Sequence, residues 1–422
     1  MKNQIFITGT GAVTPFGLGV GRLWEGLLQG KSQAVLLDDW SLPSDQSCVA
    51  ATIPAACKQQ ILLRHPVDPV LAYLQVACRE AVRQAGLNGD DLASVRTGVV
   101  IGSAVGGVVT MERAFRSSFN CGTAAPRSSS ELQMAAVDGS LYKQFCAFSV
   151  SDYIAREYAV AGFVTTMATG CTAGLDAIGF AMDLIETDEC DIVISGASEA
   201  PLTPIVITAF ENIGALSQRK DDPGRASRPF SLGRDGFVIA EAAGVVVLES
   251  LRSVERRHAR ALAQARGFSS RSNGWHMTSI HDAGTDLAEC MSDALLRGGV
   301  DKKRVSYINA HGTSTPQNDI AETNAIKRVF GAGAEHIPVS SSKSMVGHSL
   351  GAASAIGTIA CVESIRTQLV HPTANYVADA LCDLDYVTDG MRAVDIDATV
   401  CNASGFSGIH SSLVLSRAEE VL

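Results

Sequence analysis

The sequence predicts an α/β protein whose sheets are covered by helices on both faces. Short apolar runs bounded by glycine or serine recur along the chain, and each has the length of one strand. Longer segments between them repeat apolar residues at helical spacing. Continuous apolar strands that alternate with helices are typical of sheets buried on both sides. A third observation, the same order of turns in both halves of the chain, predicts a duplicated α/β unit.

The predicted elements can be placed in chain order. Strands are expected at 5–7, 98–101, 192–194, 244–248, 305–308 and 399–401, and helices at 71–85, 174–186, 286–297, 320–330 and 352–366. Each half carries a Gly-rich strand end that closes on Thr-Pro, at 8–15 and 310–316, and later a small-residue turn that opens a helix. We therefore expect an N-terminal half at 1–250 and a C-terminal half at 258–418. The seam falls within the charged stretch 252–261, and without a low-complexity linker the halves form one compact body.

Composition argues against several classes of protein. Hydrophobic residues make up 46% of the chain and charged residues 18%, which is typical of a compact enzyme. With 34 basic and 44 acidic side chains the net charge is −10, so the basic footprint of a nucleic-acid binder is missing. Eleven cysteines show no ligand spacing, and we expect reduced thiols and no metal. The sequence shows no leader and no apolar run of transmembrane length, which predicts a cytoplasmic protein outside the membrane.

Cys171 is the strongest candidate for a catalytic residue. It lies in Thr169-Gly-Cys-Thr-Ala-Gly174, between an apolar run at 163–168 and the predicted helix 174–186. A thiol on a tight turn at a helix N-terminus has free backbone N–H groups and the helix dipole beside it, and both favour the thiolate. The same N–H groups can face an oxyanion. A structural buried thiol is the alternative reading.

Two histidines and one lysine lie on small-residue turns in the second half. His311 follows an apolar strand, and Lys343 and His348 share the segment 342–348. Strand ends are where α/β folds place their chemistry, and one thiol with two histidines indicates acyl-thioester chemistry. Asp319 and Glu322 follow His311, where they could pair with Lys343 or cap a helix.

Two glycine-rich segments have weaker signals. The segment 9–17 lacks the full G-x-G-x-x-G pattern and contains Pro15, so it predicts a turn rather than a dinucleotide site. The segment 402–408 carries one large side chain, Phe406. Such a loop can gate a tunnel or simply turn the chain.

Taken together, these segments resemble the β-ketoacyl synthase family, whose members have the thiolase-like fold. The resemblance covers residues from Ile5 to about Leu415. It rests on motifs that occur in the family's order, namely Thr8-Gly-Thr-Gly-Ala-Val-Thr-Pro, Thr169-Gly-Cys-Thr-Ala-Gly-Leu-Asp-Ala177, Ser227-Arg-Pro-Phe, Arg234-Asp-Gly-Phe-Val238, His311-Gly-Thr-Ser-Thr, Lys343-Ser-Met-Val-Gly-His348 and Gly405-Phe-Ser-Gly408. The chain is most similar to the catalytic ketosynthase-alpha subunits of type II polyketide synthases, on the evidence of Thr169-Gly-Cys-Thr, Ala200-Pro-Leu-Thr-Pro204, Gln317-Asn-Asp319 and Ser404-Gly-Phe-Ser-Gly408.

The resemblance implies a layered αβαβα body and a decarboxylative condensation. Cys171 would accept an acyl group from an acyl carrier protein, and the N–H groups of Cys171 and Phe406 would form the oxyanion hole. His311 and His348 would bind the carbonyl of the malonyl thioester. Lys343, with Glu322 or Asp319, would order the histidines, and Phe406 would act as a gate. No cofactor of the chain's own is implied, because the carrier protein brings the phosphopantetheine arm.

The chain departs from the family pattern at three places. Ala240-Glu-Ala-Ala243 replaces two glycines, Gly162-Phe163 stands where the family has Gly-Pro, and the gate loop ends in Ser407-Gly-Ile-His410 rather than in Gly-Gly followed by Thr-Asn or Phe-Gln. The last departure leaves the behaviour of the pocket open.

The resemblance also leaves several functions to compare. A polyketide ketosynthase would pair with a homologous chain-length-factor-like subunit, whereas a fatty-acid 3-oxoacyl carrier-protein synthase would act as a homodimer. A non-catalytic chain-length subunit would lack the cysteine, so Cys171 with both histidines argues against it. A thiolase would need a second catalytic cysteine, and Cys401 lies outside a matching motif.

Overall fold

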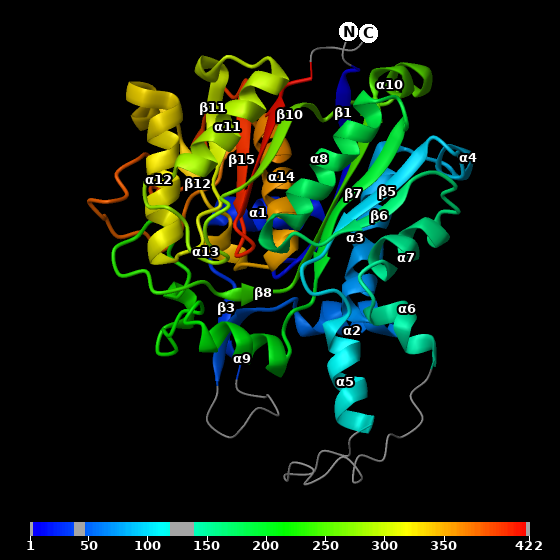
Figure 1. The fold of residues 1–422 in the computed structure, drawn as a ribbon, viewed down its shortest axis with the longest axis horizontal. Coiled ribbons are helices and arrows are strands. Elements are labelled where there is room, and N and C mark those ends of the chain that lie inside the picture. The colour runs from blue at the N-terminus through cyan, green and yellow to red at the C-terminus, as the bar shows by residue number, and fades with distance from the viewer. Residues whose placement is uncertain (1–2, 38–46, 119–138, 419–422) are drawn as a thin grey trace.

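The computed structural model describes residues 3–37, 47–118 and 139–418. Ten of their strands form two five-stranded sheets that are joined along one edge into one continuous sheet (Figure 1). The N-terminal sheet has the order β1 (Ile5–Thr14), β9 (Ala242–Ser250), β7 (Ile192–Glu199), β5 (Thr97–Gly102), β6 (Val164–Met167). The C-terminal sheet has the order β10 (Ala263–Ser272), β16 (Ile409–Ser416), β15 (Ala398–Ser404), β11 (Val305–Asn309), β12 (Val339–Ser340). Antiparallel pairing of β1 with β10 joins the two.

The two sheets have the same topology, which confirms the predicted duplication. If the five strands of each half are numbered along the chain, both sheets read 1-5-4-2-3. In both, the second strand pairs in parallel with the third and fourth, and the fifth pairs antiparallel with the fourth and first. The chain crosses from one half to the other through α10 (Leu251–Arg257), inside the predicted seam.

Helices fill the space between the sheets and cover their outer faces. The middle layer holds α8 (Ala173–Glu186) and α14 (Leu350–Thr367), which share one apolar core with both sheets. The N-terminal sheet packs outward against α3 (Pro69–Ala85) and α7 (Ser149–Glu157), and the C-terminal sheet against α11 (Thr285–Gly298) and α12 (Pro316–Phe330). This is the predicted αβαβα layering.

The sequence explains why α14 lies in the middle. Its residues Leu350–Ile365 are all buried, and glycine, alanine and serine recur along every side of the helix. A helix that is apolar and small all round has no solvent face and must be packed on all sides. The same holds for β9, which is buried from end to end and whose residues 242–248 form a continuous apolar run.

The remaining elements are short or peripheral. They are β2 (Gly17–Leu18), α1 (Val20–Gln29), β3 (Ala34–Leu37), β4 (Cys48–Ala51), α2 (Ala55–Arg64), α4 (Gly89–Leu92), α5 (Val108–Ser118), α6 (Tyr142–Phe145), α9 (Pro204–Asn212), β8 (Ile239–Ala240), α13 (Lys343–Val346), β13 (Leu369–Val370) and β14 (Arg392–Ala393), with short 3-10 turns. No helix in the described ranges combines the length and the apolar character needed to cross a bilayer.

The segment 240–243 also carries a buried carboxylate, between the two alanines that replace the glycines. Glu241 is buried between β8 and β9 and pairs with Lys58 of α2, with Nζ 2.7 Å from Oε2. It also accepts hydrogen bonds from the Tyr73 hydroxyl of α3 and from the backbone N–H of Ile53. The Glu241 carboxylate therefore ties two helices to the sheet junction.

Candidate functional site

The predicted site residues gather where parallel strands end. Cys171 follows β6, His311 follows β11, Lys343 follows β12, and Phe406 lies in the turn after β15. Carboxyl ends of parallel strands meet at one edge of a sheet, which is the place where α/β folds bind ligands. Cys171 and His348 occupy corresponding positions in the two halves, on the turns that open α8 and α14.

The four residues nearest the proposed chemistry share one small cavity of about 20 Å³. Cys171, His311, His348 and Phe406 line it, together with Phe237, Ile280, Thr313, Thr315, Asn318, Ser404 and Gly405. A neighbouring cavity of about 350 Å³ has Ile280, Thr315, Asn318 and Phe406 in its wall as well. The two cavities therefore adjoin, and Phe406 lies at their boundary.

The turn that carries Cys171 is held in a defined shape by a glycine and a carboxylate. Gly170 has φ +70°, a left-handed conformation that glycine adopts without penalty. The Asp176 carboxylate, in the first turn of α8, accepts hydrogen bonds from the hydroxyls of Thr169 and Thr172, the latter at 2.7 Å. Ser411 of β16 donates to the other oxygen of the same carboxylate. Asp176 was missed by the sequence analysis, although its position one turn into the helix was a signal.

Two backbone N–H groups converge on the Cys171 sulfur. They belong to Cys171 itself and to Phe406, and both lower the pKa of the thiol. Burial acts more strongly and raises that pKa from 9.0 to about 11, and the nearby Glu199 carboxyl adds to the increase. The N–H groups therefore favour the thiolate as predicted, but burial outweighs them, and Cys171 is a thiol in the free protein. The converging N–H groups are nevertheless the pair of donors that an acyl oxygen on sulfur would need.

Glu199 is a second residue that sequence analysis missed. It ends β7, is fully buried, and accepts hydrogen bonds from the backbone of Ala104 and Gly351. Burial raises its pKa to about 8. Nothing in the segment around Glu199 distinguishes it from an ordinary strand residue, because its partners come from distant parts of the chain.

His311 and His348 lie face to edge at the back of the cavity. Their ring centroids are 5.4 Å apart and the ring planes are 86° apart. Both rings are buried, and burial, followed by the charge of Lys343, lowers each pKa well below 6.5. Two neutral imidazoles can each donate one N–H to a carbonyl oxygen without bringing a positive charge into the cavity.

Lys343 and the two carboxylates hold the His311 loop rather than each other. Lys343 Nζ donates to the His311 carbonyl oxygen at 2.7 Å. Glu322 accepts from the backbone N–H groups of His311 and Gly312, both at 2.8 Å. Asp319 accepts from the N–H groups of Thr313 at 3.0 Å and of the next residue at 3.1 Å. Burial raises the pKa of both carboxyls, and these donors oppose the increase.

Of the two alternatives for these carboxylates, the ion pair with Lys343 is not formed. Within the described ranges, no carboxylate oxygen of Asp319 or Glu322 lies within 4 Å of Lys343 Nζ. The physical reason is that unpaired loop N–H groups lie closer to the carboxylates than the ammonium does. This arrangement resembles the capping alternative, because the carboxylates accept backbone N–H groups, but these N–H groups belong to the loop before α12.

The gate loop is tied to the nucleophile turn. The Ser407 hydroxyl donates to the Thr169 carbonyl oxygen at 3.1 Å. The ring of Phe406 packs near Phe210 and Phe237, with centroid distances of 6.4 Å to each. Ser407 belongs to the departure at 407–410, so this chain has a link across its gate that glycine could not make.

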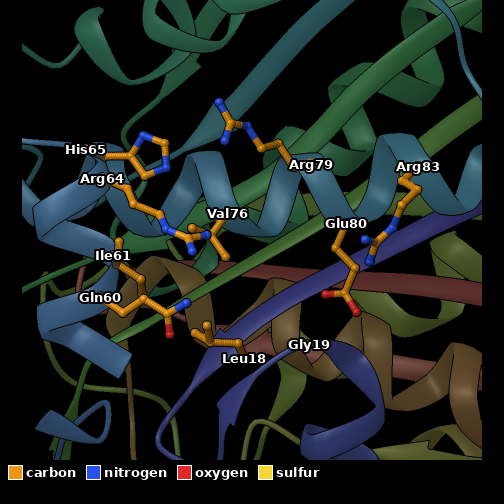
Figure 2. A pocket seen from close by; sticks show the side chains of 10 residues that line it. All are labelled: Leu18, Gly19, Gln60, Ile61, Arg64, His65, Val76, Arg79, Glu80 and Arg83. Carbon is orange, nitrogen blue, oxygen red and sulfur yellow. The ribbon is translucent and has the colours of Figure 1, made fainter. Parts of the chain in front are cut away.

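A larger cavity lies away from the predicted site. It has about 390 Å³ between α2, α3 and the start of α1, and Figure 2 shows Arg64, Arg79 and Arg83 around it. The one carboxylate in its wall, Glu80, accepts hydrogen bonds from the backbone N–H groups of Ala12 and Val20. No cysteine lines this cavity, so the nucleophile and its partners belong to the smaller one.

Two expectations concern cysteines and metals. The ten described cysteines are all free, and Cys121 lies outside the described residues. Among the described side chains, no three His, Cys, Asp or Glu groups are placed to hold a metal ion.

Comparison with known proteins places this geometry in a family. The chain matches the N-terminal domain of β-ketoacyl synthases over residues 2–253 and their C-terminal domain over residues 262–377. It is 37% identical to the tetracenomycin polyketide synthase ketoacyl synthase alpha subunit of Streptomyces glaucescens, covering 99% of this chain and 98% of the relative. It is 36% identical to 3-oxoacyl-[acyl-carrier-protein] synthase 2 of Coxiella burnetii, covering 99% of each.

Solved structures agree with the sequence relatives. A type II polyketide ketosynthase bound to a hexaketide, in complex with its acyl-carrier protein, superposes with a TM-score of 0.90 at 36% identity, covering 99% of this chain and 100% of that one. The ishigamide ketosynthase/chain length factor gives a TM-score of 0.88 at 29% identity with the same coverage. The predicted thiolase-like fold is thereby confirmed, and the chain belongs to the β-ketoacyl synthase family.

Proposed function

We propose that this chain is the catalytic ketosynthase of a type II polyketide synthase. The supporting observation is one cavity that holds a cysteine with two converging N–H donors and, opposite it, two neutral histidines. A thioester nucleophile and a pair of carbonyl-binding donors are the two parts that decarboxylative condensation requires.

In the first step the Cys171 sulfur attacks the carbonyl carbon of an acyl group carried by an acyl carrier protein. The bond from that carbon to the carrier's phosphopantetheine sulfur breaks, and the thiol proton of Cys171 leaves with the departing thiol. Because burial keeps Cys171 protonated, attack and proton transfer are coupled. The N–H groups of Cys171 and Phe406 stabilise the oxyanion of the intermediate.

In the second step a malonyl group on a carrier protein enters through the adjoining cavity and reaches the histidines in the wall of the first. His311 and His348 donate hydrogen bonds to its thioester carbonyl, the bond to the carboxylate breaks, and CO2 leaves. The electron pair remains as an enolate, whose negative oxygen the two donors stabilise. Lys343, Glu322 and Asp319 act by holding the loop that carries His311.

In the third step the enolate carbon attacks the acyl carbon on Cys171. The carbon–sulfur bond breaks, the sulfur takes up a proton, and the chain on the carrier is two carbons longer. Phe406, at the boundary of the two cavities, acts as the gate between acyl and malonyl substrates. No cofactor of this chain takes part, because the reactive thioesters arrive on the carrier's arm.

The proposed partners are an acyl carrier protein and a homologous chain-length-factor-like subunit. The support is that polyketide relatives are described with these partners. We further propose that the halves 1–250 and 258–418 act as one catalytic unit in the cytoplasm, where the ten free cysteines would stay reduced.

The test is acylation followed by intact-protein mass spectrometry. The wild-type protein is incubated with an acyl carrier protein that is loaded with an acyl group. It should gain the mass of that acyl group, and Cys171→Ala should gain none. Cys57→Ala, which removes a thiol outside the cavity, is the matched control and should be acylated normally. Acylation or condensation retained in Cys171→Ala would disprove the proposal.

The second candidate is a fatty-acid elongating homodimer, which the 36% identity to a 3-oxoacyl carrier-protein synthase favours. Co-expression with a candidate partner subunit separates the two. A stable one-to-one complex that makes keto-acyl products supports polyketide synthesis. A homodimer that elongates saturated acyl chains without a partner supports the fatty-acid function.

A further inference from the structure

A serine of the cavity wall is hydrogen-bonded to a histidine that does not itself line the cavity, and neither residue takes part in the steps proposed above. Ser404 ends β15 and lines the cavity, and His410 lies directly opposite it on β16. Ser404 Oγ and His410 Nδ1 are 2.9 Å apart. Both residues are buried, with exposed fractions of 4% and 0%. His410 also stands at one of the places where the chain departs from its family's pattern, which has asparagine or glutamine there.

The surroundings of His410 determine where its proton lies. Its Nε2 atom is buried and has no hydrogen-bond partner among the described residues. Burial lowers the pKa of His410, so the ring is neutral and carries a single N–H. A buried N–H without an acceptor is rarer in proteins than an acceptor without a donor. The proton therefore lies on Nδ1, and Nδ1–H donates to Ser404 Oγ.

This hydrogen bond fixes the role of the Ser404 hydroxyl. A serine oxygen that accepts from histidine keeps its own proton for a different acceptor. Within the described part of the chain, His410 is the one hydrogen-bond partner of Ser404 Oγ. The cavity beside it holds Cys171, while Phe237, Ile280 and Phe406 give much of its wall an apolar character. Ser404 thus brings a hydroxyl donor to a cavity wall that it shares with the apolar side chains of Phe237, Ile280 and Phe406.

We infer that Ser404 binds a carbonyl oxygen of the acyl chain beyond its thioester, and that His410 is the positioning residue that orients the Ser404 hydroxyl. The inference rests on the proposed function, since it needs an acyl group on Cys171. An unreduced polyketide chain has a keto oxygen at its third carbon, which accepts a hydrogen bond. A saturated chain has none, and it would leave the hydroxyl unpaired. Sites that hydrogen-bond a substrate discriminate against analogues that lack the bonding group.

The test compares two acyl donors of equal length. Rates of Cys171 acylation are measured by intact-protein mass spectrometry with acetoacetyl and butyryl pantetheine thioesters, and the acetoacetyl-to-butyryl ratio is the readout. One hydrogen bond of this kind corresponds to a ratio about fivefold lower in Ser404→Ala than in wild type. Ser416→Ala removes a buried serine of β16 that donates to the Arg417 carbonyl, outside the cavity, and should keep the wild-type ratio.

Two substitutions of His410 separate orientation from packing. His410→Gln supplies an N–H in place of Nδ1–H and should keep most of the wild-type ratio. His410→Leu fills the space without a donor and should lower the ratio toward that of Ser404→Ala. Circular dichroism confirms that each variant is folded.

The outcomes distinguish this inference from the proposed function. A ratio unchanged in Ser404→Ala, or equal losses with both donors, overturns the inference while acylation of Cys171 still supports the ketosynthase. Equal ratios in His410→Gln and His410→Leu overturn the positioning role of His410. A wild-type protein that neither donor acylates overturns the proposed function, and the inference falls with it.

Discussion

The Glu322 carboxylate is the sharpest place to test how the site is held together. Both of its oxygens accept backbone N–H groups of the His311 loop at 2.8 Å, and Asn402 donates to it at 3.2 Å. Glu322→Gln keeps the shape but has one acceptor oxygen, so one loop N–H would face the amide NH2. We therefore expect the loop to shift and His311 with it.

The structure sets the size of the effect on stability. Losing one hydrogen bond to a charged acceptor and leaving a buried N–H unpaired destabilises by about 2–4 kcal/mol. At about 2.1 cal/mol/K per residue, a chain of 422 residues has an unfolding entropy of about 0.9 kcal/mol/K. The Tm of Glu322→Gln should therefore fall by roughly 2–5 °C in scanning calorimetry.

The two half-reactions should respond differently. The rate of malonyl carrier-protein decarboxylation, measured by CO2 release, depends on His311. This rate should fall about a hundredfold, since small displacements of catalytic groups have effects of this size. Acylation of Cys171 uses different donors and should change less than about threefold. Glu289→Gln, at a carboxylate whose side chain is 56% exposed, is the control and should resemble wild type in all three measurements. Full decarboxylation in Glu322→Gln, or equal losses in both half-reactions at an unchanged Tm, would refute the reasoning.

Two further predictions concern the nucleophile and its helix. Because burial raises the pKa of Cys171 to about 11, its alkylation by iodoacetamide should accelerate nearly tenfold per pH unit between pH 7 and 9, and a plateau below pH 8 would contradict this. A methyl group at Gly174 would lie 2.7 Å from the Gly351 carbonyl oxygen, so Gly174→Ala should force α8 and α14 apart and lower both Tm and the rate of acylation. Gly21→Ala, also in a helix but with no atom within 4 Å of the new methyl group, should leave Tm unchanged or slightly raised, and equal effects of the two substitutions would contradict the close contact.

Local patterns were sufficient to predict most of the fold. The apolar run 244–248 lies inside β9, and the helical repeat 352–366 lies inside α14. Both rest on periodicity within one segment, which depends little on the rest of the chain. The repeated turns predicted the duplication correctly, because the same order of turns accompanies the same order of strands in each half.

Residues whose role depends on distant partners escaped the sequence analysis. Glu199 is buried beside the nucleophile by segments near residues 104 and 351. Ser404 and His410 are only six residues apart, but they meet because β15 and β16 pair in register, which neither local segment shows by itself. The role of Asp176 could have been predicted from the sequence, since its partners Thr169 and Thr172 lie on the same turn.

The sequence by itself determined which groups this protein uses: one thiol on a helix-opening turn, two histidines on strand-end turns and an aromatic side chain in a small-residue loop. These groups can be identified from local turn and helix patterns, which do not depend on tertiary contacts. Only the tertiary structure decided their chemical state. Burial leaves Cys171 a protonated thiol and both histidines neutral, and it turns Asp319 and Glu322 toward loop N–H groups instead of Lys343. Desolvation and hydrogen-bond competition depend on every layer packed around the cavity, and no single segment contains that information.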